Sequence, residues 1–465
     1  MTMKPLLAAL TLGFALSGCA ALNDTPYHTP KLKLPSAWEH GEQAGTTTAS
    51  SANLERWWQR FGDPELDTLI ELMLERNNDL AAATLKVRRA QLAADLADSN
   101  LRPSLDASVD SSASRSLKHG GGTTQSHAVS ATVSYELDLW GKLAKQRDAK
   151  VWEAQATEQD KQSTRLSLIG TTATLYWKIG YLKQRIALSQ DSIAYASKTR
   201  QLVEAQKRAG GASQLDVLNA EQTLASQEAS HTELVQQLAE ARNALSLLFD
   251  GPPGSRFQEL DRLPERPLPD IGAGVPAELL ARRPDLAAAE LRLRETLASG
   301  DATRASYYPS FSLTGSLGSS SSTLGQVLSN PVATLGAGLT LPFLQWHERQ
   351  LTIKVSEAEY QQAVVEFRQT LYQALSDVEN ALSARSQYRA QGDQLTASIT
   401  AARQAERLYE VRYRAGGGTL KDWLEAQETR RQADITLLQN RYNRLANQVT
   451  LYQALGGDST VGKDG

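Results

Sequence analysis

An internal duplication limits what this 465-residue chain can fold into. When the chain is laid on itself with a shift of 206 residues (285 − 79), residues 80–251 align with the second half without a gap. Within residues 202–220, 9 of 19 positions are identical to their counterparts. A repeat this long predicts one structural unit built twice, rather than several unrelated domains.

Each copy shows the same order of helix and strand patterns. In the first copy, residues 67–102 have the Ala and Leu spacing of a helix that ends before a proline. Two alternating stretches, residues 105–110 and 129–139, predict strands with one apolar and one polar face, joined by a glycine-rich hairpin loop. The strands of the second copy are expected at residues 311–317 and 335–343.

A very long helix is expected after each strand pair, because no proline follows the strands until the copy ends. In the first copy it spans residues 141–209, about 100 Å at 1.5 Å per residue. Gly210 and Gly211 then break it, and residues 213–249 predict a second helix. Apolar residues in that second helix recur at steps of 4 and 3, so we expect it to fold back on the first as a coiled coil.

The apolar faces of the four strands need a cover that the rest of the chain does not supply. Strands of about 11–13 residues with alternating faces are typical of outer-membrane barrels, whose apolar side chains face lipid and whose polar side chains face a wet lumen. Four strands cannot close a barrel, so closure requires two copies, with 8 strands (2 × 4), or three, with 12 (3 × 4). A soluble sandwich is the alternative.

Composition excludes several classes of protein. No run of about 18 apolar residues occurs, so a polytopic helical transporter is excluded. Lys plus Arg (49) and Asp plus Glu (52) nearly balance, which gives no basic field for nucleic acid. The single cysteine excludes an internal disulfide and a cysteine zinc cluster. No HExxH, GxSxG, P-loop or dinucleotide motif is present, so we expect no metal, no cofactor and no enzyme activity.

The N-terminus predicts export and lipidation. Residues 1–18 have the charge and apolar stretch of a signal peptide, and residues 16–19 read Leu-Ser-Gly-Cys, which resembles the bacterial lipobox. That resemblance implies diacylglycerol and an N-acyl chain on Cys19. Ala20 follows where an Asp marks inner-membrane retention, which implies an outer-membrane anchor. A buried core cysteine behind an ordinary signal peptide is the alternative.

Residues 57–457 resemble the outer membrane factor (TolC- and OprM-like) family, and especially its lipoprotein branch. The marks are Trp57-Trp58, Phe61, Asp63-Pro64, Leu66, Leu69-Ile70, Asn78-Asp79-Leu80, Glu278-Leu279-Leu280-Ala281-Arg282-Arg283-Pro284-Asp285, Ala289-Glu290, Tyr308-Pro309-Ser310, Leu313-Thr314-Gly315 and Tyr413-Arg414-Ala415-Gly416.

The resemblance implies the assembly and its partners. It implies a mixed α/β membrane protein that forms a homotrimer with a 12-stranded β-barrel in the outer membrane, a 12-helix coiled-coil barrel in the periplasm and equatorial segments around it. Such a channel passively conducts substrates from an inner-membrane transporter (RND, ABC or MFS type) and a periplasmic adaptor (membrane fusion protein) out of the cell. The expected parts of the chain are a signal peptide (1–18), a lipidated tether (19–52), the first repeat (53–251), a crossover (252–276), the second repeat (277–457) and a tail (458–465).

Candidate functional residues lie at the two glycine turns. Glycines let another backbone approach closely, and the resemblance implies that the turns are periplasmic tips that meet the adaptor. Plain helix C-caps are the alternative. The expected contact residues are Gly210, Gly211, Leu215, Leu218, Gly416, Gly417, Leu420 and Leu424.

A gate is expected beside the tips. Asp216, Asp422 and Glu425 lie within a few turns of them, where three copies can place rings of like charge that raise one another's pKa. Solvated acids near a helix end are the alternative. The resemblance implies a polar tie by Tyr413, although Gly418 stands where the family has an arginine.

Two tryptophans at equivalent positions are candidates for a membrane interface. Trp140 and Trp346 close the second strand of each pair, where aromatic rings suit a membrane interface or the junction of strand and helix.

The runner-up functions are a pore-less lipid-anchored adaptor or coiled-coil scaffold and a type I secretion duct. A lipid-anchored hydrolase lacks a catalytic set. The long alternating strands favour a channel over an adaptor.

Overall fold

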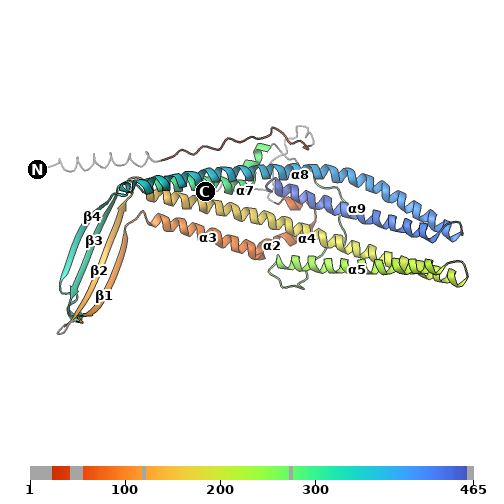
Figure 1. Ribbon diagram of the computed structural model, residues 1–465, viewed down its shortest axis with the longest axis horizontal. Coiled ribbons are helices and arrows are strands. Elements are labelled where there is room, and N and C mark those ends of the chain that lie inside the picture. The colour runs from red at the N-terminus through yellow and green to blue at the C-terminus, as the bar shows by residue number, and fades with distance from the viewer. Residues whose placement is uncertain (1–23, 42–55, 118–121, 272–275, 458–465) are drawn as a thin grey trace. The chain divides into compact units, whose positions relative to one another are not determined.

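The computed structural model describes most of the chain, in four stretches (Figure 1). They are residues 24–41, 56–117, 122–271 and 276–457. The expected signal peptide, Cys19 and the expected tail at residues 458–465 lie outside the described residues.

The chain forms two compact units, each taken here by itself. The strand unit comprises Met1–Leu32, Leu85–Gln159 and Ala288–Thr370. The helical unit comprises Lys33–Thr84, Asp160–Ala287 and Leu371–Gly465. Each unit takes segments from both copies of the repeat, so the copies are interleaved and do not form two separate domains.

Both copies have the same order of elements, which confirms the duplicated fold. The first contains η2 (Trp57–Phe61), α2 (Pro64–Arg76), α3 (Asn78–Ser99), β1 (Ser104–Arg115), β2 (Thr123–Leu137), α4 (Lys142–Arg208) and α5 (Gln214–Leu247). The second contains η3 (Pro276–Glu278), α6 (Leu279–Arg282), α7 (Pro284–Ala305), β3 (Ser310–Ser321), η4 (Leu324–Gln326), β4 (Pro331–Thr340), η5 (Pro342–Leu344), α8 (Trp346–Arg414) and α9 (Leu420–Ala454).

The strand unit holds one antiparallel sheet in the order β1-β2-β3-β4 (Figure 1). Leu105 lies opposite Val133, Val133 opposite Gly315, and Gly315 opposite Leu335. Because successive residues of a strand point to opposite faces, this row belongs to an apolar face. The next row belongs to the other face and is polar: Asp106, Thr132, Ser316 and Thr334.

The expected helix over residues 67–102 is wrong in one respect, because the structure has two helices there, α2 and α3. Asn77 between them has an extended backbone (φ −68°, ψ 126°). Its side chain accepts the Leu80 N–H (3.0 Å) and donates to the Leu248 carbonyl (2.9 Å). The asparagine therefore caps α3 and ties the break to α5, a contact that spacing does not reveal.

Two strands end earlier than the alternation predicts. β2 ends at Leu137 because the Asp138 carboxylate accepts two backbone N–H groups of the first turn of α4 (3.0 and 2.8 Å). β4 ends at Thr340, and Pro342, which has no N–H for a ladder, begins η5. Of the residues expected on strands, Leu139 and Leu341 therefore lie in connections, and Phe343 lies in η5.

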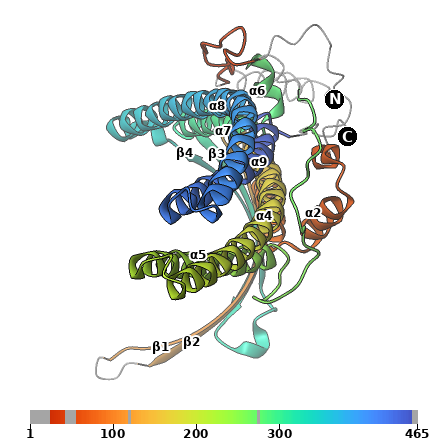
Figure 2. The same ribbon diagram turned by 90° about the vertical axis from the view of Figure 1, so that its right-hand side faces the viewer.

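The long helices agree with the sequence. α4 has 67 residues and α8 has 69. Figures 1 and 2 both show α5 lying along α4 and α9 along α8. The residues that recur at steps of 4 and 3 lie in the same core as residues of α4: Leu234, Leu238, Ala241 and Leu245 are buried, and Leu248, just past the end of α5, is partly buried.

The core of the helical unit is centred on aromatic side chains. The Trp57 ring stacks on Tyr452, and Phe61 meets Trp177 edge-on, each pair with ring centroids 4.7 Å apart. Trp57 and Trp177 are each 1% exposed. The motif residues at the start of the first copy thus build the core from which α4, α5 and α9 extend. Among the described residues, no helix is long and apolar enough to cross a bilayer.

Candidate functional site

The apolar face of the sheet is exposed in a single chain. Leu335 is 92% exposed, Val109 77% and Leu105 72%. Contiguous apolar surface of this kind marks a site covered by lipid or protein. β1 and β4 are the edges of the sheet, so each presents backbone N–H and C=O groups to a further strand.

The two equivalent tryptophans lie in different surroundings within the strand unit. Trp140 donates its Nε1–H to the Pro309 carbonyl (2.7 Å) and stacks on Tyr308 with ring centroids 5.0 Å apart. It therefore packs at the junction of β2 and α4. Trp346 begins α8, is 61% exposed and has the Arg349 guanidinium 5.6 Å from its ring.

The two helical hairpins end in turns of the same geometry. Gly210 and Gly416 have φ of +79° and +76°, the left-handed conformation that glycine adopts without strain. The next residue of each turn bonds back to the helix, Gly211 N to Gln206 O (2.8 Å) and Gly417 N to Arg412 O (3.0 Å). This pattern is a Schellman C-cap. Nothing lies within 4 Å of where a Cβ of Gly210 or Gly416 would be, so both turns are open.

Asp216 and Asp422 have a local role. Ser213 and Thr419 are the N-caps of α5 and α9, and each forms a capping box with the aspartate three residues later. Hydrogen bonds from the Thr419 hydroxyl and backbone N–H hold the pKa of the Asp422 carboxyl below its usual range. Both carboxylates are thus engaged with their own helix, and Glu425 is exposed beside Lys421 (3.7 Å).

The four leucines expected at the tips divide into two pairs. Leu215 is 66% exposed and Leu218 is 51% exposed. Leu420 is 4% exposed and belongs to a buried apolar cluster, and Leu424 packs against that cluster. The first tip therefore leaves both of its leucines exposed, whereas the second uses Leu420 for its own packing.

A cluster of buried side chains joins the two hairpins near the tips, and it is called here the tip cluster. Trp423 of α9 is 2% exposed, stacks on Tyr413 of α8 (ring centroids 5.2 Å) and meets Tyr195 of α4 edge-on (6.1 Å). The apolar members beside these rings are Val203, Val217 and Leu420. Spacing alone did not single out Trp423 or Tyr195. A signal was available at Trp423, because the equivalent position in the first copy is Val217 (423 − 206).

The two tyrosines of the tip cluster also make polar contacts across the hairpins. The Tyr413 hydroxyl donates to Gln206 Oε1, and the Tyr195 hydroxyl donates to Glu410 Oε2 (3.4 Å). Burial, with a smaller effect of Asp216, raises the pKa of Tyr413. Burial, with smaller effects of nearby glutamates, raises the pKa of Tyr195 to about 12. Both phenols therefore stay protonated at neutral pH and keep donating.

The segment after Cys19 is held against the helices. Residues 24–41, called here the strap, contain no helix or strand. In the strand unit, the Thr25 N–H and hydroxyl donate to Asp301 (3.0 and 2.7 Å), whose side chain is 2% exposed. Asp24 pairs with Lys145 in the first turn of α4. The described part of the expected tether is therefore docked along the helices.

One group of side chains in the described residues has metal-ligand spacing. Ligand atoms of Glu39, His40 and Glu379 lie within 4.8 Å of one another. The Glu379 carboxylate, however, already accepts the backbone N–H groups of Glu39 (3.2 Å) and His40 (2.7 Å) and pairs with the His40 ring. We assign it to fastening the strap in the helical unit and assign no metal to it.

A comparison with known families decides the identity of this architecture. The sequence profile of the outer membrane efflux protein family matches residues 69–250 and 275–457, one match in each copy of the repeat. The chain belongs to the outer membrane efflux protein family.

Relatives and solved structures agree with this assignment. The chain is 33% identical to the "Pyoverdine export outer membrane protein OpmQ" of Pseudomonas putida, over 98% of each chain. It is 31% identical to "Toxin and drug export protein A" of Aggregatibacter actinomycetemcomitans, over 99% of this chain and 100% of that one. The open-state MtrE outer membrane channel of Neisseria gonorrhoeae superposes with a TM-score of 0.80 at 28% identity, over 93% of this chain and 97% of that one.

The outer membrane efflux protein described here is therefore a channel of tripartite efflux pumps, located in the outer membrane and extending into the periplasm. It is not an enzyme. The soluble sandwich and the pore-less adaptor or scaffold are excluded as interpretations. In this setting the strands are the membrane-spanning part, because their exposed apolar face matches lipid, and the long hydrophilic helices are the periplasmic part.

Proposed function

We propose that three copies of this outer membrane efflux protein form one passive duct. A periplasmic adaptor and an inner-membrane transporter deliver substrates to it, and the duct carries out no chemistry. The open four-stranded sheet with its exposed apolar face carries the proposal. Three copies supply 12 strands (3 × 4), which close a barrel with apolar side chains toward lipid and a wide polar lumen.

We also propose that the channel belongs to the lipoprotein branch and is anchored by diacylglycerol and an N-acyl chain on Cys19. The lipobox sequence and the docked strap support this. A strap fastened five residues after Cys19 (24 − 19) holds an anchor at the membrane instead of leaving it on a free tether. The anchor adds membrane affinity to that of the strands.

The open turns of the two hairpins are the proposed docking surface for the adaptor. Backbone without side chains lies exposed there, and two exposed leucines flank the first turn. The proposed contact residues are Gly210, Gly211, Leu215, Leu218, Gly416, Gly417 and Leu424. Leu420 contributes by packing beneath the second turn.

The tip cluster is the proposed closing element of the periplasmic aperture. Tyr413 links α8 to Gln206 of α4, and Trp423 fills the space between the hairpins, so separation of the hairpins must break both contacts. Asp216, Asp422 and Glu425 add negative charge beside this closure, which favours cations at the entrance. A type I secretion duct remains the second candidate, and the word "toxin" in the name of one relative supports it.

Conductance of the purified full-length protein in planar lipid bilayers tests the proposal, together with its mass in detergent. We expect a trimer and discrete channels, with Tyr413→Phe conducting more than the wild type because the bond to Gln206 is lost. Tyr409→Phe, at an exposed position one turn earlier on α8, is the matched control and should leave conductance unchanged. Monomers without channels would contradict the proposed trimeric duct. An unchanged conductance of Tyr413→Phe would contradict only the proposed closing role of the tip cluster.

A further inference from the structure

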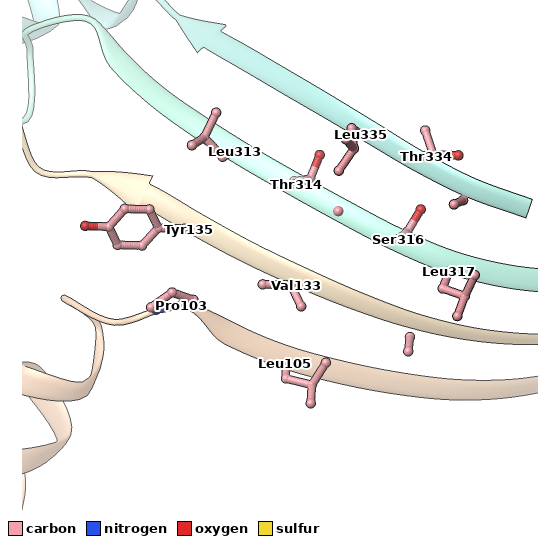
Figure 3. Close-up of a pocket in the computed structure, with 13 residues that line it drawn as sticks. Pro103, Leu105, Val133, Tyr135, Leu313, Thr314, Ser316, Leu317, Thr334 and Leu335 are labelled. Carbon is pink, nitrogen blue, oxygen red and sulfur yellow. The ribbon is translucent and has the colours of Figure 1, made fainter. Parts of the chain in front are cut away.

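An open recess lies on the apolar face of the sheet, and the strand register places Gly315 within it. Gly315 of β3 lies between Val133 of β2 and Leu335 of β4, and its neighbours on the same face are Leu313 and Leu317. The side chains around Gly315 border an open recess of about 540 Å³ (Figure 3). A Cβ on Gly315 would meet Leu335 Cδ2 at 3.4 Å and no other atom within 4 Å, so a larger side chain there would extend into the recess. None of the residues that line this recess is charged.

The recess lies at the end of the sheet that connects to the helices. Its lining includes Leu105, the second residue of β1, and Tyr135, which is two residues before the end of β2. Lys145, in the first turn of α4, follows Tyr135 by ten residues (145 − 135). Because the helices extend into the periplasm, the recess belongs to the periplasmic leaflet of the membrane.

The strap is fastened in this same unit. Besides the Asp24 pair with Lys145 and the Thr25 bonds to buried Asp301, the Tyr27 ring lies 4.5 Å from the Arg294 guanidinium. Three of the first four described residues therefore hold the strap in place. The segment that leads to Cys19 starts from a fixed point beside α4.

The length of the remaining chain keeps the anchor near the start of α4, which follows the strand that borders the recess. Asp24 follows Cys19 by five residue steps (24 − 19), and an extended chain covers at most about 18 Å over five steps. The lipid on Cys19 is thus delivered to the periplasmic leaflet beside the start of α4. Its acyl chains are flexible hydrocarbon, the chemistry that an uncharged apolar recess accepts.

We propose that the recess around Gly315 binds one acyl chain of the lipid on Cys19 of the same chain. This inference rests on the lipidation of Cys19 proposed above. The bound acyl chain fills the gap in the apolar face and fixes the anchor beside its own barrel strands, in place of a position free in the bilayer.

Photocrosslinking from the anchor tests this. Cells that express the full-length protein are fed a fatty acid with a terminal diazirine, and outer membranes are irradiated. Peptides joined to the peptide that begins at Cys19 are then identified by mass spectrometry. We expect the crosslinks to concentrate on strand residues that line the recess, such as Leu105 and Leu335, and to fall at least threefold in Gly315→Val.

Ala337→Val is the matched control, because Ala337 lies on the same face but outside the recess, and it should leave the crosslinks unchanged. Asp24→Ala, which releases the strap from Lys145, should spread them over the apolar face. Crosslinks to phospholipid alone, or crosslinks that Gly315→Val does not reduce, would contradict binding of the acyl chain in the recess. They would not contradict the lipidation of Cys19. An intact mass without acyl groups on Cys19 would overturn both.

Discussion

The two hairpin tips have related sequences and different surroundings. Both have a left-handed glycine and a capping box, 206 residues apart (416 − 210). Two of the positions at which they differ matter most for packing, because Val217 and Lys207 of the first tip correspond to Trp423 and Tyr413 of the second. The rings of the second tip pack against α4 of the first hairpin. The duplication therefore repeats the backbone of the tip, and two aromatic residues give the second tip its contacts with the first hairpin.

Trp423→Ala removes the largest side chain of the tip cluster and should have the largest effect. Truncation of a buried tryptophan lowers stability by about 3–5 kcal/mol. We expect faster amide exchange in the last turns of α8 and the first turns of α9, and higher conductance. Val217→Ala at the equivalent position should have a much smaller effect. Equal effects of the two substitutions would show that the tips do not differ in the way described.

Removal of the N-caps tests what the two tips share. Ser213→Ala and Thr419→Ala should each destabilise the first turn of its helix by about 1 kcal/mol, because each deletes one side of a capping box. Hydrogen exchange of α5 and α9 measures both. Each variant should affect its own hairpin alone, and a change in the opposite hairpin would contradict the local role assigned to these caps.

The smallest expected effect is a pH dependence at the second tip. The pKa of Asp422 is below that of an ordinary aspartate, so its ionised form is favoured in the folded tip. Its contribution is complete above the ordinary aspartate pKa and is lost as the pH falls through the lowered value. Amide exchange of the first turn of α9, corrected for intrinsic rates, should show this loss. Asp422→Asn should abolish it, and a pH response that persists in that variant must come from another group.

Much of the fold was predictable because the spacing of apolar residues and the positions of glycines determine it locally. The alternation in the strands, the steps of 4 and 3 in α5 and the glycine breaks at residues 210 and 416 each have one structural meaning. The division of the first helix at Asn77 was not predictable, since it depends on a bond to Leu248, 171 residues away (248 − 77). The early ends of β2 and β4 depend on the bonds of the Asp138 carboxylate to the first turn of α4 and on Pro342, and the alternation of apolar residues reveals neither.

The sequence predicted where the candidate site residues lie, but not which contacts they make. The sequence placed Asp216 and Asp422 near the tips, but their engagement in capping boxes follows from helices that begin at Gln214 and Leu420. The burial of Leu420 and the exposure of Leu215 depend on which hairpin packs into the other. The docked strap depends on Asp301, a buried carboxylate far from Thr25 in sequence.

The sequence by itself determined the duplicated order of elements, the amphipathic strands and the glycine turns, because these depend on local backbone preferences and on the period of apolar residues. Only the tertiary structure decided which equivalent residues differ in role. Trp140 packs on Tyr308 while Trp346 is exposed, and Leu424 is partly buried while its equivalent Leu218 is exposed. The physical reason is that burial is a property of neighbours, and the neighbours of the two copies come from segments far apart in the chain.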